Sequence, residues 1–179
     1  MSKNLTERTT RSNAALSRRR FLVQAGTVLA ASRVVPGRVA AQQTRVKDTC
    51  VFCRIVAGRS PGHKLWEDKE FFAFLDNKPI NPGHTLLIPK LHYEYLFEMP
   101  EPKYERLLKR TRLLAAPLRT AMEAKRIGLI VEGFGVAHCH IHLVPIYGPG
   151  EMQKKGVVGV TNEEFEKIAV KIRPFLEKI

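Results

Sequence analysis

The sequence lacks several features that would assign it to a particular class of protein. Its most apolar leader segment runs for only about a dozen residues before Arg33, well short of the ~20 residues that a membrane-spanning helix needs. It contains no internal repeat and no low-complexity tract, and its Pro/Gly clusters separate short elements rather than domains. These absences argue against a stable membrane span and favour one folded domain.

Acidic residues are also scarce, with 17 Asp and Glu against 30 Lys and Arg and a net charge of +13. Residues 1–41 hold eight of the basic residues and one acid, so the remaining 138 residues hold 22 basic and 16 acidic residues, a net +6. A pocket for polyphosphates could use this charge, but aromatic residues are not interleaved with a basic patch. We therefore expect weak affinity for polynucleotides and no specific nucleic-acid partner.

The N-terminal segment resembles a twin-arginine signal peptide. Residues 17–22 read Ser-Arg-Arg-Arg-Phe-Leu, a short and modestly apolar stretch follows, and Val39-Ala40-Ala41 offers small residues for cleavage. We expect a signal peptide over residues 1–41, a mature domain over 42–179, and export to the periplasm or the exterior. An organellar transit peptide and a disordered tail remain open, and without a working leader the protein would stay in the cytoplasm.

Patterning in the rest of the chain predicts an α+β fold. A short helix is expected at 51–56, a long one at 103–125 with a kink at Pro117, and a third that opens with a capping box at Thr161–Glu164 and bends or stops at Pro174. Segments rich in β-branched and aromatic residues predict five strands. These are residues 64–67, 71–75, 84–89, 127–132 and 136–146. The expected architecture is a five-stranded antiparallel sheet with two main helices.

Three histidines at every second position form the most informative stretch of the chain. His138, His140 and His142 would share one face of a strand, whereas Cys139 and Ile141 would face the core. Three imidazoles in this register can bind one metal ion or present a row of nitrogen groups to an anionic substrate. Imidazole suits phosphoryl or nucleotidyl transfer, because it is a neutral nucleophile near pH 7 and then a good leaving group.

The stretch resembles the signature of the histidine-triad (HIT) family of nucleotide hydrolases and transferases. The resemblance continues upstream, in residues 50–58 (Cys-Val-Phe-Cys-Arg-Ile-Val-Ala-Gly), 74–76 (Phe-Leu-Asp) and 83–92 (Gly-His-Thr-Leu-Leu-Ile-Pro-Lys-Leu-His). It covers about residues 48–147, and the order of these motifs is specific. The family implies a HIT-like fold and a homodimer.

The resemblance also implies roles for individual residues. His140 would attack the α-phosphate and carry a nucleotidyl group, His142 and His84 would line the phosphate site, and Asp76 would accept hydrogen bonds from the ribose. An apolar slot for a purine base would be formed by Val51, Phe52, Ile55 and Phe74. Taken alone, these apolar residues are more often core, and Asp76 could simply form a turn.

Cys50 and Cys53 form a Cys-x-x-Cys pair, which by itself admits a disulfide, a redox pair or half of a zinc site. One branch of the HIT family binds zinc with two such cysteines and with histidines that match His92 and His138. The resemblance therefore implies a closed, structural zinc site.

The sequence departs from the family just before the triad. Many members have Gly-Gln-Ser/Thr-Val-x-His there, whereas residues 133–138 read Gly-Phe-Gly-Val-Ala-His, without the amide and hydroxyl side chains. The first functional hypothesis is a hydrolase that cleaves purine nucleoside phosphoramidates or nucleotide anhydrides through His140. A nucleotide- or zinc-binding module with little turnover is the alternative, and a metallohydrolase with all three histidines on one ion is a third.

Overall fold

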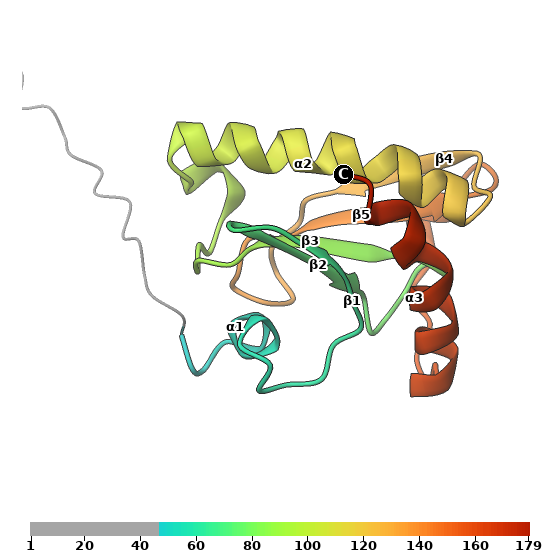
Figure 1. Cartoon of the computed structure of the whole chain (residues 1–179), viewed down its shortest axis with the longest axis horizontal. Coiled ribbons are helices and arrows are strands. Elements are labelled where there is room, and N and C mark those ends of the chain that lie inside the picture. Colours follow the sequence, from blue (N-terminus) through green and yellow to red (C-terminus); the bar gives the residue numbers. More distant parts are fainter. Residues whose placement is uncertain (1–46) are drawn as a thin grey trace, which may run out of the picture. The chain divides into compact units, whose positions relative to one another are not determined.

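The computed structural model describes residues 47–179; the expected signal peptide and the expected mature start at Gln42 lie outside this range. The described residues form a five-stranded antiparallel sheet in the order β1-β2-β3-β5-β4, with helices on both sides (Figure 1). The strands are β1 Lys64–Glu67, β2 Phe71–Leu75, β3 Thr85–Pro89, β4 Arg126–Ile130 and β5 Ile141–Ile146. The helices are α1 Val51–Val56, α2 Glu101–Ala121 and α3 Asn162–Leu176, with 3-10 turns at Leu96–Glu98 and Glu151–Gln153. None of the described helices is both long and apolar enough to cross a membrane.

The sheet has a core on each face. Along β2 the side chains alternate, so that Phe71 and Ala73 pack with α2 and α3, whereas Phe72 and Phe74 pack with α1. Every residue of β2 and β3 is buried, as expected for strands covered on both faces. The core on the α1 side is the smaller one, and it adjoins the functional groups described below.

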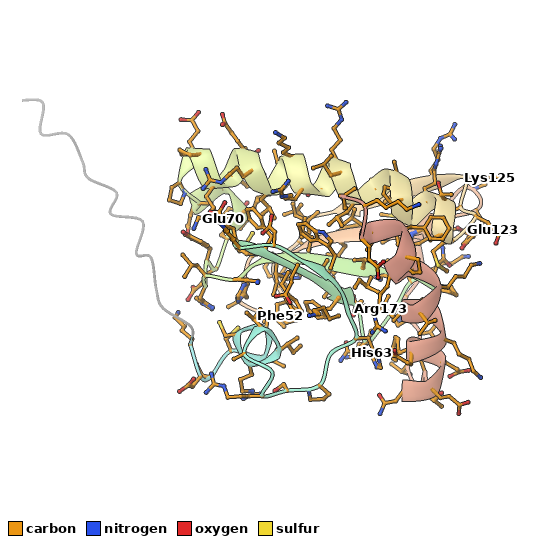
Figure 2. The ribbon with its side chains drawn as sticks, in the orientation of Figure 1. Phe52, His63, Glu70, Glu123, Lys125 and Arg173 are labelled. Carbon is orange, nitrogen blue, oxygen red and sulfur yellow. The ribbon has the colours of Figure 1, made fainter. Side chains whose placement is uncertain are left out.

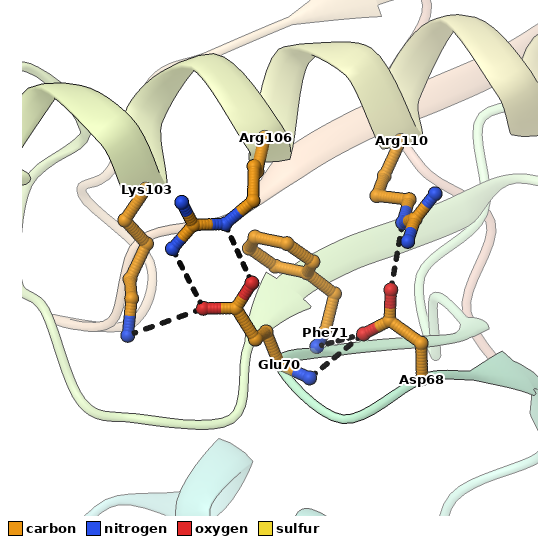
Figure 3. A network of polar contacts seen from close by, with 6 residues as sticks. All are labelled: Asp68, Glu70, Phe71, Lys103, Arg106 and Arg110. Atoms are coloured by element: carbon orange, nitrogen blue, oxygen red, sulfur yellow. Dashed lines mark hydrogen bonds and ion pairs between the residues drawn. The ribbon is translucent and has the colours of Figure 1, made fainter.

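Ion pairs join α2 to the turn between β1 and β2 (Figure 3). Arg106 Nε and Nη2 contact the Glu70 carboxylate at 2.6 and 2.9 Å, and Arg110 Nε contacts Asp68 Oδ2 at 2.7 Å. The second oxygen of Asp68 accepts hydrogen bonds from the backbone N–H groups of Glu70 and Phe71. These contacts fix the turn, although partly exposed pairs of this kind stabilise a fold only modestly.

The prediction of a strand over residues 136–146 was wrong in its first half. β5 begins at Ile141, where it pairs with Leu87 of β3. Upstream, Cys139 N–H donates to the carbonyl of Tyr93, which lies beyond the end of β3 in an irregular segment. β3 itself continues to Pro89, so the ladder with β5 ends because residues 134–138 bend and the His138 N–H donates to the Val136 carbonyl rather than to β3.

Both prolines lie inside helices that continue past them, so the expectation that Pro174 could stop its helix was wrong. α2 passes Pro117 to Ala121, and α3 passes Pro174 to Leu176. A proline in a helix deprives the carbonyl four residues earlier of its hydrogen-bond donor. Those carbonyls belong to Leu113 and Val170, residues with relative exposures of 37% and 58% that lie on the outer faces of their helices. The predicted capping box at Thr161 and Glu164 is confirmed.

Candidate active site and metal centre

A cavity of about 670 Å³ lies on the α1 side of the sheet. Seven residues that the sequence assigned to a nucleotide site line it: Val51, Phe52, Ile55, Phe74, Asp76, His140 and His142. His84 does not line it; this residue is 2% exposed and lies behind His142. His84 therefore lies one layer behind His142, and any part that it plays at the phosphate site would act through that residue.

The three triad histidines point to one side of the sheet, although the regular strand begins only at Ile141. The Phe52 ring of α1 makes edge contacts with the rings of His138 and His140, at centroid distances of 5.8 and 5.3 Å. Cys139 faces the opposite core, as predicted. The imidazoles do not converge on one ion, because His138 contacts two cysteines and His142 contacts His84. This geometry argues against the metallohydrolase hypothesis.

His140 is held in one tautomer by the backbone. Its Nδ1 lies 2.6 Å from the carbonyl oxygen of His138, and since a carbonyl only accepts, Nδ1 must carry a proton. Burial is the main cause that lowers the pKa of His140, so the ring is neutral near pH 7. A neutral ring with its proton on Nδ1 has its lone pair on Nε2, which makes Nε2 the nucleophilic nitrogen.

A series of hydrogen bonds fixes the tautomers of His84 and His142. Ile80 N–H donates to His84 Nδ1 at 3.1 Å, so the proton of neutral His84 lies on Nε2. Burial lowers the pKa of His84 to about 4, which keeps this ring neutral. His84 Nε2–H then donates to His142 Nδ1 at 2.9 Å, and His142 carries its own proton on Nε2. This series of hydrogen bonds therefore leaves the Nε2–H of His142 as a donor at the wall of the cavity.

Asp76 lies beside the two histidines at the end of β2. Its Oδ2 is 3.6 Å from both His84 Nε2 and His142 Nδ1, and its Oδ1 accepts the backbone N–H of Lys78 at 2.9 Å. Burial by itself would raise the pKa of this carboxyl, but its contacts with the two imidazoles and the hydrogen bond from the Lys78 N–H outweigh burial, and the net pKa is lowered. Asp76 is therefore ionised at the cavity wall. It also forms the turn after β2 that the sequence predicted as its alternative, purely structural role.

The residues of the expected apolar slot for the base also belong to, or pack against, the smaller core on the α1 side of the sheet. Phe52 and Phe74 are 8% and 3% exposed and meet edge to face at 5.4 Å, yet both line the cavity. Next to them, the loop before the triad contributes Gly135 and Val136 to the wall, whereas Phe134 is 90% exposed. No polar side chain of residues 133–137 faces the cavity, in keeping with the departure seen in the sequence.

Sequence reasoning missed one wall of the cavity. Asn162 and Phe165 from α3, together with His63 from the loop before β1, also line it. The capping box located the start of α3, but a helix pattern does not reveal which part of the fold the helix covers. No signal in the sequence placed these residues near the triad.

A second cluster joins Cys50, Cys53, His92 and His138, all of them buried. Both thiols are unbridged. His138 Nδ1 lies 3.5 Å from Cys50 Sγ and 3.6 Å from Cys53 Sγ, and His92 Nδ1 lies 3.4 Å from Cys53 Sγ. In a tetrahedral zinc site with Zn–S of about 2.3 Å and Zn–N of about 2.05 Å, a sulfur and a nitrogen ligand are about 3.6 Å apart. The donor atoms thus have the spacing that zinc requires.

The protonation of the cluster also fits a metal. His138 Nε2 donates to the Pro89 carbonyl at 2.9 Å, so the lone pair of neutral His138 lies on Nδ1, toward the thiols. Burial lowers the pKa of His138 to about 4, which keeps this lone pair available. His92 Nε2 lies 3.7 Å from the Glu94 carboxylate, the kind of outer partner that orients a ligand histidine. The residues present therefore fit a structural zinc ion.

The sequence model of the HIT domain family matches residues 57–148 of the chain. The chain belongs to the HIT family. It is 34% identical over 135 residues to an uncharacterized HIT-like protein of Methanocaldococcus jannaschii, a match that covers 69% of this chain and 98% of the relative.

Two further relatives are named for an activity. An adenylylsulfatase of Arabidopsis thaliana is 34% identical over 109 residues, which is 58% of this chain and 55% of that protein. An adenosine 5'-monophosphoramidase of Saccharomyces cerevisiae is 34% identical over 101 residues, 54% of this chain and 61% of that protein. This HIT protein thus has nucleotide hydrolases among its distant relatives.

Solved structures confirm the fold. A histidine triad nucleotide-binding protein of Sulfolobus tokodaii superposes with a TM-score of 0.66 at 30% identity, covering 72% of this chain and 93% of that one. A zinc-bound histidine triad family protein of Mycobacterium smegmatis gives a TM-score of 0.63 at 26% identity, covering 73% and 94%. The predicted α+β HIT fold is confirmed, and the zinc-bound neighbour agrees with the buried Cys/His cluster.

Proposed function

We propose that this HIT protein hydrolyses nucleotides, with purine nucleoside phosphoramidates or anhydrides as substrates and His140 as the nucleophile. The observation that carries the proposal is the contact between His140 Nδ1 and the His138 carbonyl, which directs the lone pair to Nε2 in a ring that lines a nucleotide-sized cavity. The names of the plant and yeast relatives support the reaction class.

In the first step, His140 Nε2 forms a bond to the α-phosphorus, and the bond from phosphorus to the leaving nitrogen breaks. The leaving group keeps the electron pair and departs as an amine after it takes up a proton from solvent. His142 Nε2–H donates a hydrogen bond to the developing negative charge, because His84 holds the proton of His142 on that nitrogen.

In the second step, water attacks the phosphorus of the nucleotidyl-histidine, and the bond between phosphorus and Nε2 breaks. The electron pair returns to Nε2, the nucleoside monophosphate leaves, and the proton released by water goes to solvent. The two steps together consume one water molecule and leave the histidine unchanged.

We further propose that Asp76 accepts hydrogen bonds from the ribose and that the slot of Val51, Phe52, Ile55 and Phe74 takes the base. Zinc would be held by Cys50, Cys53, His92 and His138, which leaves no open position for substrate. Its contribution would be structural, since it would tie α1 and the segment after β3 to His138, whose carbonyl orients the nucleophile.

Intact-mass spectrometry tests the reaction. The protein is mixed with an adenosine phosphoramidate and quenched within milliseconds, with His140→Ala alongside. We expect a covalent nucleotidyl adduct in the wild type only, and a loss of turnover of about 10⁴-fold or more in the variant. An adduct that persists in His140→Ala, or turnover that survives in it, would contradict the assignment of the nucleophile.

A nucleotide-binding module with little turnover is the second candidate. The cavity wall formed by Gly135 and Val136 offers no side-chain donor, and this observation favours slow chemistry. A folded wild-type protein that binds AMP but forms neither adduct nor product would establish this alternative.

Two further parts of the proposal rest on resemblance alone. We propose a homodimer, for which light scattering of the purified chain is the test. We also propose export through the segment that contains Arg18 and Arg19, and cell fractionation of an Arg18→Lys/Arg19→Lys variant would test it, since retention of that variant inside the cell is expected.

A further inference from the structure

The cavity does not end at the base slot formed by α1 and β2. It continues to the loop before β1 and to α3, where His63, Asn162 and Phe165 line it. α3 spans Asn162–Leu176 and therefore lies wholly outside the part of the chain that the HIT family model matches. Two of these far-wall residues, Asn162 and Phe165, are thus contributed by a helix that the family model does not include, whereas His63 lies within the matched range.

The far wall has an aromatic surface. The imidazole of His63 stacks on the ring of Phe165, with centroids 5.1 Å apart and planes inclined by 26°. Phe165 is 7% exposed and packs into the main core, whereas His63 is partly exposed. Figure 2 shows His63 beside α3 and Phe52 on α1. Aromatic side chains of the cavity wall therefore come from α1 (Phe52), from the loop before β1 (His63) and from α3 (Phe165).

Polar contacts hold this wall in place. His63 Nδ1 lies 3.3 Å from Glu166 Oε2, and Arg173 Nη1 binds the same carboxylate at 2.6 Å. Arg173 Nε donates to the carbonyl oxygen of Lys64 at 2.9 Å, so α3 is joined to the residue that follows His63. The side chains of His63 and Arg173 lie near each other at the edge of α3 in Figure 2. The stacked pair is therefore oriented before any ligand arrives, which reduces the entropy lost on binding.

We infer that His63 and Phe165 form the base-recognising end of the nucleotide pocket, and that α3 thereby sets the specificity of this chain for the nucleobase. The inference rests on the proposed function, because it takes the ligand to be a nucleotide. A planar base has apolar faces that stack on aromatic rings. Asn162 adds an amide that both donates and accepts, which matches the mixed edge of adenine.

Calorimetric titration with AMP and with ribose 5-phosphate tests the inference, because the second ligand lacks the base. We expect His63→Ala to weaken AMP binding about tenfold, through the loss of the ring face, and to leave ribose 5-phosphate binding unchanged. His63→Phe keeps a ring at the same position and should restore AMP binding to within about twofold. Lys167→Ala, an exposed position on α3 that does not line the cavity, is the matched control and should bind both ligands as the wild type does.

Equal affinity of wild type and His63→Ala for AMP would overturn the inference. So would an equal loss for AMP and ribose 5-phosphate in His63→Ala, since that would indicate general damage to the pocket. AMP binding that depends on His63 in a protein without turnover would refute the proposed reaction and leave this inference intact. If His63→Ala turns over an adenosine phosphoramidate with an unchanged KM, the proposed reaction stands and this inference is refuted. A wild type that binds no AMP would refute both the proposed reaction and the inference.

Discussion

His138 and His140 are two residues apart, share one side of the sheet and are both buried, yet they present opposite ring nitrogens for chemistry. His138 donates from Nε2 to the Pro89 carbonyl and turns the lone pair of Nδ1 toward two thiols. His140 donates from Nδ1 to the His138 carbonyl and keeps its lone pair on Nε2. The position of a backbone carbonyl therefore decides which ring nitrogen of each neutral imidazole keeps its lone pair, Nδ1 in His138 and Nε2 in His140.

The two environments are also connected. The ring of His138 belongs to the Cys/His cluster, and its carbonyl orients His140, so one residue joins that cluster to the candidate active site. The clusters differ in their openness: the four metal-site residues are buried, whereas His140 and His142 line the cavity. Changes in the first cluster should act mainly on stability, and changes in the second mainly on turnover.

The largest effect is expected from the loss of the metal centre. Cys53 is 0% exposed and lies near both ligand histidines. We expect Cys53→Ser to abolish zinc binding and to lower the free energy of unfolding by about 4 kcal/mol or more, as losses of structural metals do. Zinc content by mass spectrometry and thermal unfolding with and without a chelator provide the measurement.

Cys139 supplies the matched control for this change. It is 2% exposed, but it faces the opposite core and does not belong to the Cys/His cluster. Cys139→Ser should retain one zinc per chain, although a buried hydroxyl will cost some stability. Equal zinc content in the two variants, whether full or zero, would contradict the assignment of the cluster.

A smaller effect, on turnover, is expected from His84. Its Nε2–H fixes the tautomer of His142, so His84→Ala should lower kcat about 10²-fold even though residue 84 does not line the cavity. His142→Ala should lower kcat by a similar factor. Because His84 acts through His142, the double variant should lose little more than either single variant, and this non-additivity is the measurement. Independent, multiplying losses would show that the two histidines act separately.

The pH profile offers a milder test of the same comparison. His140 must be neutral to attack, and burial lowers its pKa below the usual value of about 6.5. As the pH falls, kcat/KM should therefore stay within about threefold of its neutral value at pH 6.5 and decrease only below that, when His140 gains its proton. An acid limb centred above pH 6.5 would show that a group other than a buried imidazole controls the reaction.

Some of these features could be predicted from the sequence, and others could not. The predicted facing of His138, Cys139 and His140 is confirmed even outside the regular strand, since Cys139 packs into the main core whereas the two imidazole rings contact Phe52 of α1. The position of His84 behind His142, and the contribution of Phe165 to the cavity, could not be predicted. Both depend on how elements far apart in the chain pack together, which local periodicity does not encode.

The smallest effect is expected in the loop before the triad, where the chain departs from its family. A Cβ added at Gly135 meets no atom within 4 Å, and Gly135 lines the cavity next to the active-site groups. Gly135→Ser should therefore fit without strain and supply the hydroxyl donor that the family resemblance implies at this position, raising kcat about threefold through one added hydrogen bond. Gly135→Ala adds the Cβ without the hydroxyl and should leave kcat unchanged. If both variants gain equally, the benefit comes from a stiffer loop, and the missing donor does not limit the chemistry.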